Sequence, residues 1–283
     1  MSEVIAAAKG LRYVYPDGAE VALQGVELSI GAGEVAAILA ANGGGKTTLL
    51  KLIAGLLRPA EGRVRVFGLD PYRDFERVRT RLGAVFQNPA EQVIGPTVRD
   101  DVGFGLGHLN LSRQELGARV DAVLERLGIA HLAGRIPHYL SAGELKKVAL
   151  AGALAARPEL LILDEPFAQL DTQAVEELAV LLKEINRDWG TAIIFTSHQP
   201  EPAAMLAETV YVLAGGGVAA RGTPREVFSN LDALAKSRLR PPGLFVLADI
   251  LQRAGLAVEP HWDAGRMAAE ILAAAGMVPG RQA

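Results

Sequence analysis

The sequence predicts an α/β protein in which helices cover both faces of a largely parallel β-sheet, and three observations support this. First, the apolar run 160–163 is followed at once by Asp164 and Glu165. An unbroken apolar run is typical of a strand buried on both faces, and open α/β sheets bind ligands beyond the carboxyl ends of their strands. Second, residues 35–56 have the pattern of a strand, a glycine-rich loop and a helix. Third, the pattern becomes helical between residues 89 and 156.

The amino-terminal region, through Phe86, contains strand-like segments. Asp17 and Gly18 lie between Tyr15 and Val21, and this dipeptide favours a β-hairpin turn. We therefore expect an antiparallel sheet that packs on the core.

The glycine-rich loop covers residues 40–48. Backbone N–H groups of such a loop, with the partial positive charge at the start of the next helix, hold phosphate oxygens. Lys46 would reach the outer phosphates, and the Thr47 hydroxyl would bind Mg²⁺. An ordinary glycine-rich turn is the alternative interpretation. The residues expected to contact the nucleotide here are Asn42, Gly43, Gly44, Gly45, Lys46, Thr47 and Thr48.

Ala40 stands where the usual GxxxxGK[ST] pattern has its first glycine. Because alanine disfavours positive φ, either the backbone at Ala40 is ordinary or the loop is slightly strained. The glycines nearest to the phosphates are present, so we expect nucleotide binding to survive.

Asp164 and Glu165 allow two interpretations. Asp often caps helices and Pro often begins them, so Asp164, Glu165 and Pro166 can form a plain strand-to-helix connection. Together with the glycine-rich loop, the same carboxylates are expected to hold a metal ion, at Asp164, and to act as a base, at Glu165.

The segment from Ser141 to Glu144 precedes a helix-like run that continues to Leu154. Ser141 and Glu144 form a capping box. A capped helix start with exposed Ser141 and Gly143 is also an anion site, so both interpretations can hold together. The chain would then have a second phosphate-binding helix start.

Taken in order, these motifs resemble those of the ABC transporter ATPases, over about residues 5–230. The signature segment departs from the family's LSGGQ at Ala142 and Glu144, and it keeps Gly143. The other matching positions are Tyr15 as the aromatic that stacks on adenine, Gln87 of the Q-loop, Asp164 and Glu165 of Walker B, Asp171 of the D-loop and the switch residue His198.

The resemblance implies a P-loop ABC ATPase core, with a RecA-like mixed sheet and an antiparallel β subdomain, in residues 1–88 and 157–231. Residues 89–156 would form an inserted helical subdomain. Residues 232–283 would form a helical extension.

The resemblance also implies two ATP molecules held between two copies of the chain. Ser141 and the Gly143 N–H would bind the γ-phosphate held by the partner copy. Glu165 would polarise the attacking water and His198 would contact the γ-phosphate. Asp164, Thr47 and Gln87 would hold Mg²⁺, with Gln87 also touching the water. Two alternatives stay open: Tyr13 in place of Tyr15, and His198 as a solvated loop residue.

Composition limits the function. The net charge is -3, which does not support a nucleic-acid partner, and the absence of cysteine excludes disulfides and thiolate metal sites. No apolar run approaches the roughly eighteen residues that span a bilayer. The start of the chain, at residues 1–4, lacks a signal-like pattern, so we expect no export. We expect contact with a membrane only through partner proteins.

The segment 240–243, Arg-Pro-Pro-Gly, predicts a hinge before two short helices. Helices this short need a packing surface, either on their own core or on a second copy. We favour a contact in a homodimer. The apolar positions expected on one face of each helix are Leu244, Leu247, Ile250 and Leu251 in the first, and Met267, Ile271 and Leu272 in the second.

Residues 86–105 and the Pro-Pro extension look similar to the energy-coupling factor group, and within it to cobalt or nickel transport ATPases. That similarity implies ATP and Mg²⁺ as cofactors. It also implies a homodimer held at the cytoplasmic face of the membrane by a transmembrane scaffold and a substrate-capture subunit. The scattered histidines do not identify the ion. A vitamin-uptake transporter, a non-transport ABC ATPase and a regulatory module are the alternatives.

Overall fold

The structure is a computed structural model that describes residues 3–107, 109 and 111–277. Residues 1–2, 108, 110 and 278–283 lie outside the description. The outer ends of the first and last predicted domains therefore lie outside it, as do His108 and the first two residues of the segment 1–4, which lacks a signal-like pattern. The division of the chain into three domains stays a prediction.

The described strands form one mixed sheet with the order β4-β1-β2-β9-β8-β3-β7-β6-β5. Strands β8, β3, β7, β6 and β5 pair in parallel with their neighbours, whereas β8 and β9 are antiparallel. Strands β4, β1 and β2 are antiparallel and join the rest at the pair Gly25 and Gly217. The strands are β1 Val4–Val14, β2 Glu20–Gly31, β3 Val35–Leu39, β4 Glu61–Val66, β5 Leu82–Val85, β6 Leu160–Leu163, β7 Ala192–Ser197, β8 Thr209–Ala214 and β9 Gly217–Gly222.

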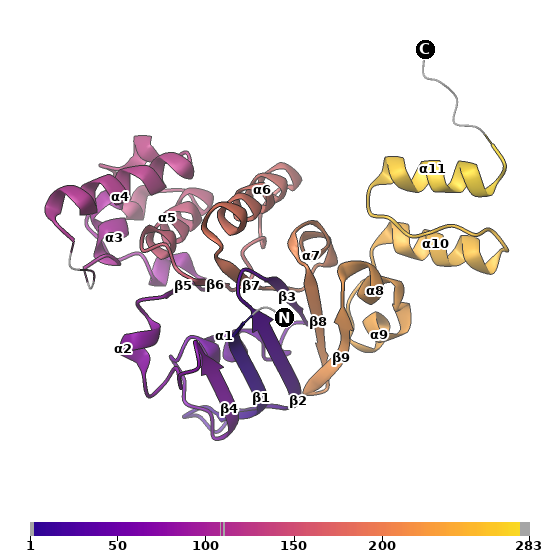
Figure 1. Ribbon diagram of the computed structural model, residues 1–283, viewed down its shortest axis with the longest axis horizontal. Helices are drawn as coiled ribbons and strands as arrows, with labels where there is room; N and C mark the ends of the chain where they lie inside the picture. The colour runs from indigo at the N-terminus through magenta and orange to yellow at the C-terminus, as the bar shows by residue number, and fades with distance from the viewer. Residues whose placement is uncertain (1–2, 108, 110, 278–283) are drawn as a thin grey trace, which may run out of the picture.

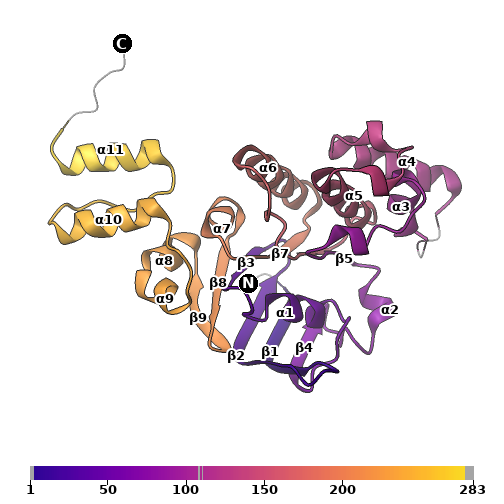
Figure 2. The same cartoon turned by 180° about the vertical axis from the view of Figure 1, so that it is seen from behind.

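The predicted hairpin is confirmed. Strands β1 and β2 pair up to Val14 and Glu20, and Gly18 in the turn has a φ of 86°. The backbone N–H of Ala19 donates to the Asp17 carboxylate at 2.9 Å, which fixes the turn locally. Figure 2 shows α1 (Lys46–Ile53) lying against these antiparallel strands.

The apolar run at 160–163 is a central parallel strand, as predicted. Strand β6 pairs with β5 and β7, and all of its residues are buried. Leu161 and Leu163 belong to the core on the side of α5, α6 and α7, whereas Leu160 and Ile162 belong to the core that contains α1. Full burial of each leucine contributes about 1.5–3 kcal/mol, so both faces of the run stabilise the sheet.

Within the described part of the chain, the helices α3, α4 and α5 and three 3-10 turns follow β5, and they lie beyond the β5 edge of the sheet (Figure 1). A capping box at Ser112 begins α4, and another at Thr223 begins α8. The helices are α1 Lys46–Ile53, α2 Phe75–Val78, α3 Val98–Phe104, α4 Arg113–Arg126, α5 Ala142–Ala155, α6 Thr172–Trp189, α7 Pro200–Leu206, α8 Pro224–Ser229, α9 Leu231–Lys236, α10 Gly243–Arg253 and α11 Ala264–Ala274, with 3-10 turns η1 Pro89–Glu91, η2 Ala130–Leu132 and η3 Pro137–Tyr139.

Both helices of the predicted extension are present, at the end of the molecule opposite α3–α5 (Figure 1). On α10, Leu247 and Ile250 of the predicted face are exposed, whereas Phe245, which the prediction did not place on that face, is buried. The Phe245 ring packs against Phe228 of α8, at 5.9 Å between ring centroids. The extension thus has a contact with its own chain, and the homodimer contact stays a prediction.

Among the described residues, none of the helices combines the length and the apolar character that crossing a membrane requires.

Candidate nucleotide-binding site

The glycine-rich loop joins β3 to α1 and leaves the start of α1 open to an anion. Gly45 caps α1 without a side-chain hydrogen bond, so the first N–H groups of the helix have no side-chain partner at the cap. Gly43 and Gly45 have φ angles of 78° and 80°, which side chains disfavour. Ala40 is not among the described residues with positive φ, so its backbone is ordinary and the loop is not strained there.

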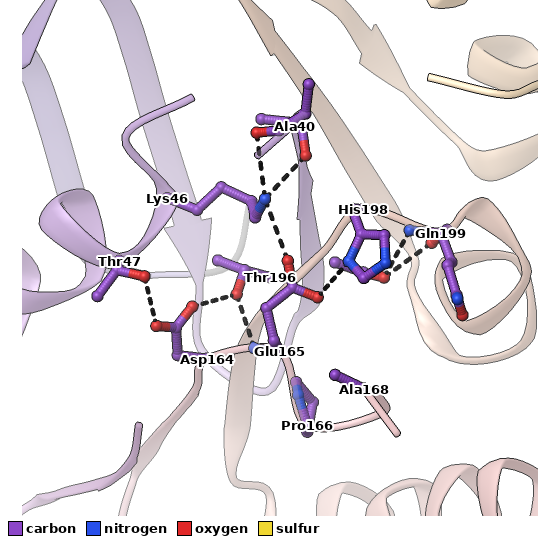
Figure 3. Close-up of polar contacts among 12 residues, drawn as sticks. Ala40, Lys46, Thr47, Asp164, Glu165, Pro166, Ala168, Thr196, His198 and Gln199 are labelled. Carbon is purple, nitrogen blue, oxygen red and sulfur yellow. Dashed lines mark hydrogen bonds and ion pairs between the residues drawn. The ribbon is translucent and has the colours of Figure 1, made fainter. Parts of the chain in front are cut away.

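Lys46 points across the loop toward the end of β6 (Figure 3). Its Nζ atom donates to the carbonyl oxygens of Ala40, at 2.8 Å, and Ala41, at 3.3 Å. The same atom lies 3.1 Å from Oε1 of Glu165, and both side chains are less than a tenth exposed. Buried charges need such partners, because each alone would lose its hydration without compensation.

His198 completes this group, although it is the most exposed member. Its Nδ1 atom lies 2.9 Å from Oε2 of Glu165. Lys46, Glu165 and His198 follow three neighbouring strands, β3, β6 and β7, which pair in parallel. Carboxyl ends of parallel strands meet at one edge of a sheet, and this topology brings together residues far apart in the sequence.

The two principal predicted metal ligands also touch each other. The Thr47 hydroxyl donates to Oδ2 of Asp164 at 2.6 Å, and Asp164 is buried. Within the described parts of the chain, no group of three or more His, Cys, Asp or Glu could hold a metal alone. A hydroxyl and a carboxylate nevertheless fit Mg²⁺, which usually takes one or two carboxylates and completes its shell with phosphate oxygens and water.

Thr196 was missed by the sequence reasoning. Its buried hydroxyl donates to Oδ1 of Asp164 at 2.6 Å and accepts the N–H of Glu165 at 2.9 Å. One side chain therefore orients both acidic residues. The available signal was a polar residue that directly follows the apolar strand segment 192–195.

The Q-loop residue Gln87 follows β5 and is exposed. It lines a cavity of about 550 Å³ together with Asp164 and Gly143. The walls of this cavity come mainly from α5, from α6 and from residues 126–132 at the end of α4 and just after it, so Gln87 and the start of α5 open onto the same space as the acidic residue. Contact of Gln87 with a metal stays a prediction.

Ser141 and Asp171 act as helix caps. Ser141 caps α5, and its hydroxyl donates to Glu144 at 2.6 Å. These hydrogen bonds hold the pKa of Glu144 below its ordinary value. Asp171 caps α6 by accepting the N–H of Ala174 at 2.8 Å. The roles of Ser141, Gly143 and Asp171 at a second copy's nucleotide stay predictions.

Tyr15 lies beside the glycine-rich loop. Its hydroxyl is 2.7 Å from Oγ1 of Thr48, and its ring meets the edge of Tyr13 at 4.8 Å. Tyr13 packs against the core. Stacking of Tyr15 on adenine stays a prediction.

The family model described as ABC transporter matches residues 23–168, more than half of the chain. The chain belongs to the ABC transporter family. It is therefore an ATP-binding protein and an ATP hydrolase coupled to transport, as predicted. The similarity to solved ABC ATPase structures also confirms the predicted mixed α/β fold of this family.

Relatives with energy-coupling factor names are similar over most of their length. The energy-coupling factor transporter ATP-binding protein EcfA of Methanothermobacter thermautotrophicus is 39% identical over 254 residues, which cover 89% of this chain and 81% of the relative. EcfA1 of Symbiobacterium thermophilum is 40% identical over 258 residues, which cover 88% of this chain and 90% of the relative. The solved structure of cbiO1 from Clostridium perfringens, part of the ABC transporter complex cbiONQ, has a TM-score of 0.74 and 37% identity. That match covers 88% of this chain and 100% of the other.

Proposed function

We propose that this ABC ATPase powers an energy-coupling factor importer for cobalt or nickel ions. We choose this type of transporter because the chain is similar to cbiO1 over the whole length of that protein. The contacts among Lys46, Glu165 and His198 support hydrolysis of ATP by the chain itself.

In the proposed reaction, ATP phosphates take the place of Glu165 beside Lys46. Glu165, which is then free of the ammonium group, accepts a proton from the attacking water. His198, whose Nδ1 atom lies 2.9 Å from Oε2 of Glu165, contacts the γ-phosphate. Thr47 and Asp164, with Gln87, would hold Mg²⁺, which when bound neutralises phosphate charge. Catalysis then consists mainly of positioning and charge neutralisation.

A second copy of the chain completes each site in this proposal. Ser141 and the Gly143 N–H of one copy meet the γ-phosphate held by the glycine-rich loop of the other. The exposed side chains of Leu247 and Ile250 on α10 are available for the homodimer contact. A transmembrane scaffold and a substrate-capture subunit hold the dimer at the cytoplasmic face of the membrane, with no nucleic acid involved.

Transport by the assembled complex tests the proposal. The chain is co-expressed with its transmembrane and capture subunits, purified as a complex and placed in liposomes. We expect ATP-driven accumulation of Co²⁺ or Ni²⁺, and no accumulation with the Glu165→Gln chain. Uptake of a vitamin in place of the ions would identify the alternative energy-coupling factor transporter, and ATP hydrolysis without association with membrane subunits would contradict a transport role.

A further inference from the structure

Lys146 joins the helix of the signature segment to the loop that carries Glu165. Its Nζ atom donates to the carbonyl oxygen of Pro166 at 3.0 Å and to that of Ala168 at 2.8 Å. Lys146 lies on α5, which begins after Ser141, whereas the two carbonyl groups belong to the loop 164–171 between β6 and α6. The contact therefore spans two elements that the proposed function assigns to different nucleotides.

The loop 164–171 has a backbone that needs external restraint. Glu165 and Gln169 have φ angles of 50° and 64°, in the left-handed region that residues with a Cβ atom disfavour. Such conformations persist where the surroundings over-determine them. On the sheet side, Thr196 holds the N–H of Glu165. On the helical side, Lys146 holds both carbonyl groups between the two left-handed residues.

The environment of Lys146 makes this contact costly to break. The side chain is half-buried, and its burial lowers the pKa of the ammonium group. An ammonium group removed from water needs acceptors, and the two carbonyl oxygens take two of its three N–H groups. The neighbouring Lys147 is exposed and has no hydrogen bond among the described side-chain contacts, so it offers a matched comparison.

We propose that Lys146 is a positioning residue that couples the two ATP sites of the dimer. When Ser141 and Gly143 engage the nucleotide held by the partner copy, α5 moves with them. Lys146 transmits that movement to the loop 164–171 and so sets Glu165 beside the nucleotide of its own chain. This inference rests on the proposed function, because it requires the sandwich of two copies.

Three variants of the full-length chain, assembled with its partners, test the coupling. Lys146→Met removes the ammonium group and keeps the length of the side chain, Lys146→Arg keeps charged donors, and Lys147→Met removes one charge from the exposed neighbour. Hydrolysis is measured against ATP concentration, and binding to a single site is measured with a fluorescent ATP analogue. Amide hydrogen exchange of residues 165–171 is measured without nucleotide.

We expect wild-type hydrolysis to be cooperative in ATP. In Lys146→Met, kcat should fall about 10-fold and the Hill coefficient should approach 1, while the affinity of a single site changes less than about 2-fold. Exchange in the loop 164–171 should become faster. Lys146→Arg should recover most of the cooperativity, and Lys147→Met should behave as wild type. If Lys146→Met does not fold, Lys146→Gln, which keeps a neutral donor, should show an intermediate loss.

Wild-type cooperativity and loop exchange in the folded Lys146 variants would overturn the coupling and leave the proposed function intact. An equal loss in Lys147→Met would overturn it as well, because the effect would then be one of charge alone. A wild-type chain that binds no ATP would overturn the proposed function itself, whatever the Lys146 variants do.

Discussion

The Nζ atom of Lys46 lies 3.1 Å from Oε1 of Glu165, and the two side chains are 7% and 8% exposed. The other carboxylate oxygen of Glu165 is hydrogen-bonded to His198. When two opposite charges are both buried away from water, each one needs the other to compensate for its lost hydration. Lys46 therefore neutralises the predicted base in this arrangement, and ATP phosphates compete with Glu165 for the same ammonium group.

Replacement of Glu165 by Gln should separate ATP binding from hydrolysis. The amide keeps the shape of the side chain but cannot accept a proton from water, so we expect phosphate release to fall at least 100-fold. ATP binding and dimer formation should persist, because Lys46 and the loop glycines remain. The matched control is Glu176→Gln on the exposed side of α6, which should leave the rate unchanged. Equal rates in the Glu165→Gln and wild-type proteins would exclude the base role.

Replacement of Lys46 by Met should weaken both the fold and ATP binding. Glu165 would stay buried without its cation, and breaking one side of a buried pair costs about 3–5 kcal/mol. Urea unfolding without nucleotide should show a loss near the lower end of that range, since His198 still contacts Glu165. Lys183→Met, at an exposed position of α6, is the control and should change the unfolding free energy by less than about 0.5 kcal/mol.

The double variant Lys46→Met with Glu165→Gln decides whether the pair is the cause. Both charges are then absent, so much of the loss caused by Lys46→Met should be recovered. If the double variant instead loses the sum of the unfolding free energies that the two single variants lose, the 3.1 Å contact does not couple these residues energetically.

Features set by local patterns were predictable from the sequence. The apolar run 160–163 could only be satisfied by burial on both faces, and Asp17 with Gly18 fixes a turn through its own hydrogen bond. The capping boxes at Ser112 and Ser141 likewise depend on residues three positions apart. Each of these features is decided within a few residues of chain.

Features that depend on contacts between distant segments were not predictable. Thr196 binds Asp164 only because β6 and β7 are neighbours, which no local pattern specifies. The α10 helix turns Phe245 inward because Phe228, 17 residues earlier, offers an aromatic surface. Leu247 and Ile250 have the spacing of a buried helix face, but they are exposed because the helix turns Phe245 inward instead.

Replacement of Ser141 by Arg should abolish turnover and leave the affinity of a single site for ATP nearly unchanged. On the proposed function, the phosphate that Ser141 binds belongs to the partner copy, and a large side chain would block closure. Ser112→Arg is the control, because Ser112 forms the same capping box at the start of α4. Both variants should lose about 1 kcal/mol of unfolding free energy, whereas only Ser141→Arg should lose hydrolysis. A parallel collapse of single-site ATP affinity in Ser141→Arg would contradict the two-copy site.

Acid should weaken the start of α5 through Glu144. Hydrogen bonds from the hydroxyl and N–H of Ser141 hold the pKa of this carboxyl below its ordinary value of 4.5. The unfolded chain therefore binds the proton more tightly than the folded one. The capping box contributes stability above about pH 4.5, and this contribution is lost as the pH falls through the lower pKa of the folded protein.

Glu144→Gln should reduce this acid dependence, because a glutamine can form the same capping box but does not titrate. The measurement is the free energy of unfolding in urea at a series of pH values from about 7 to 3. Glu176→Gln, at an exposed position outside any capping box, should leave the curve unchanged. If Glu144→Gln follows the wild-type curve at every pH, the Ser141 hydrogen bonds do not stabilise the charged carboxylate.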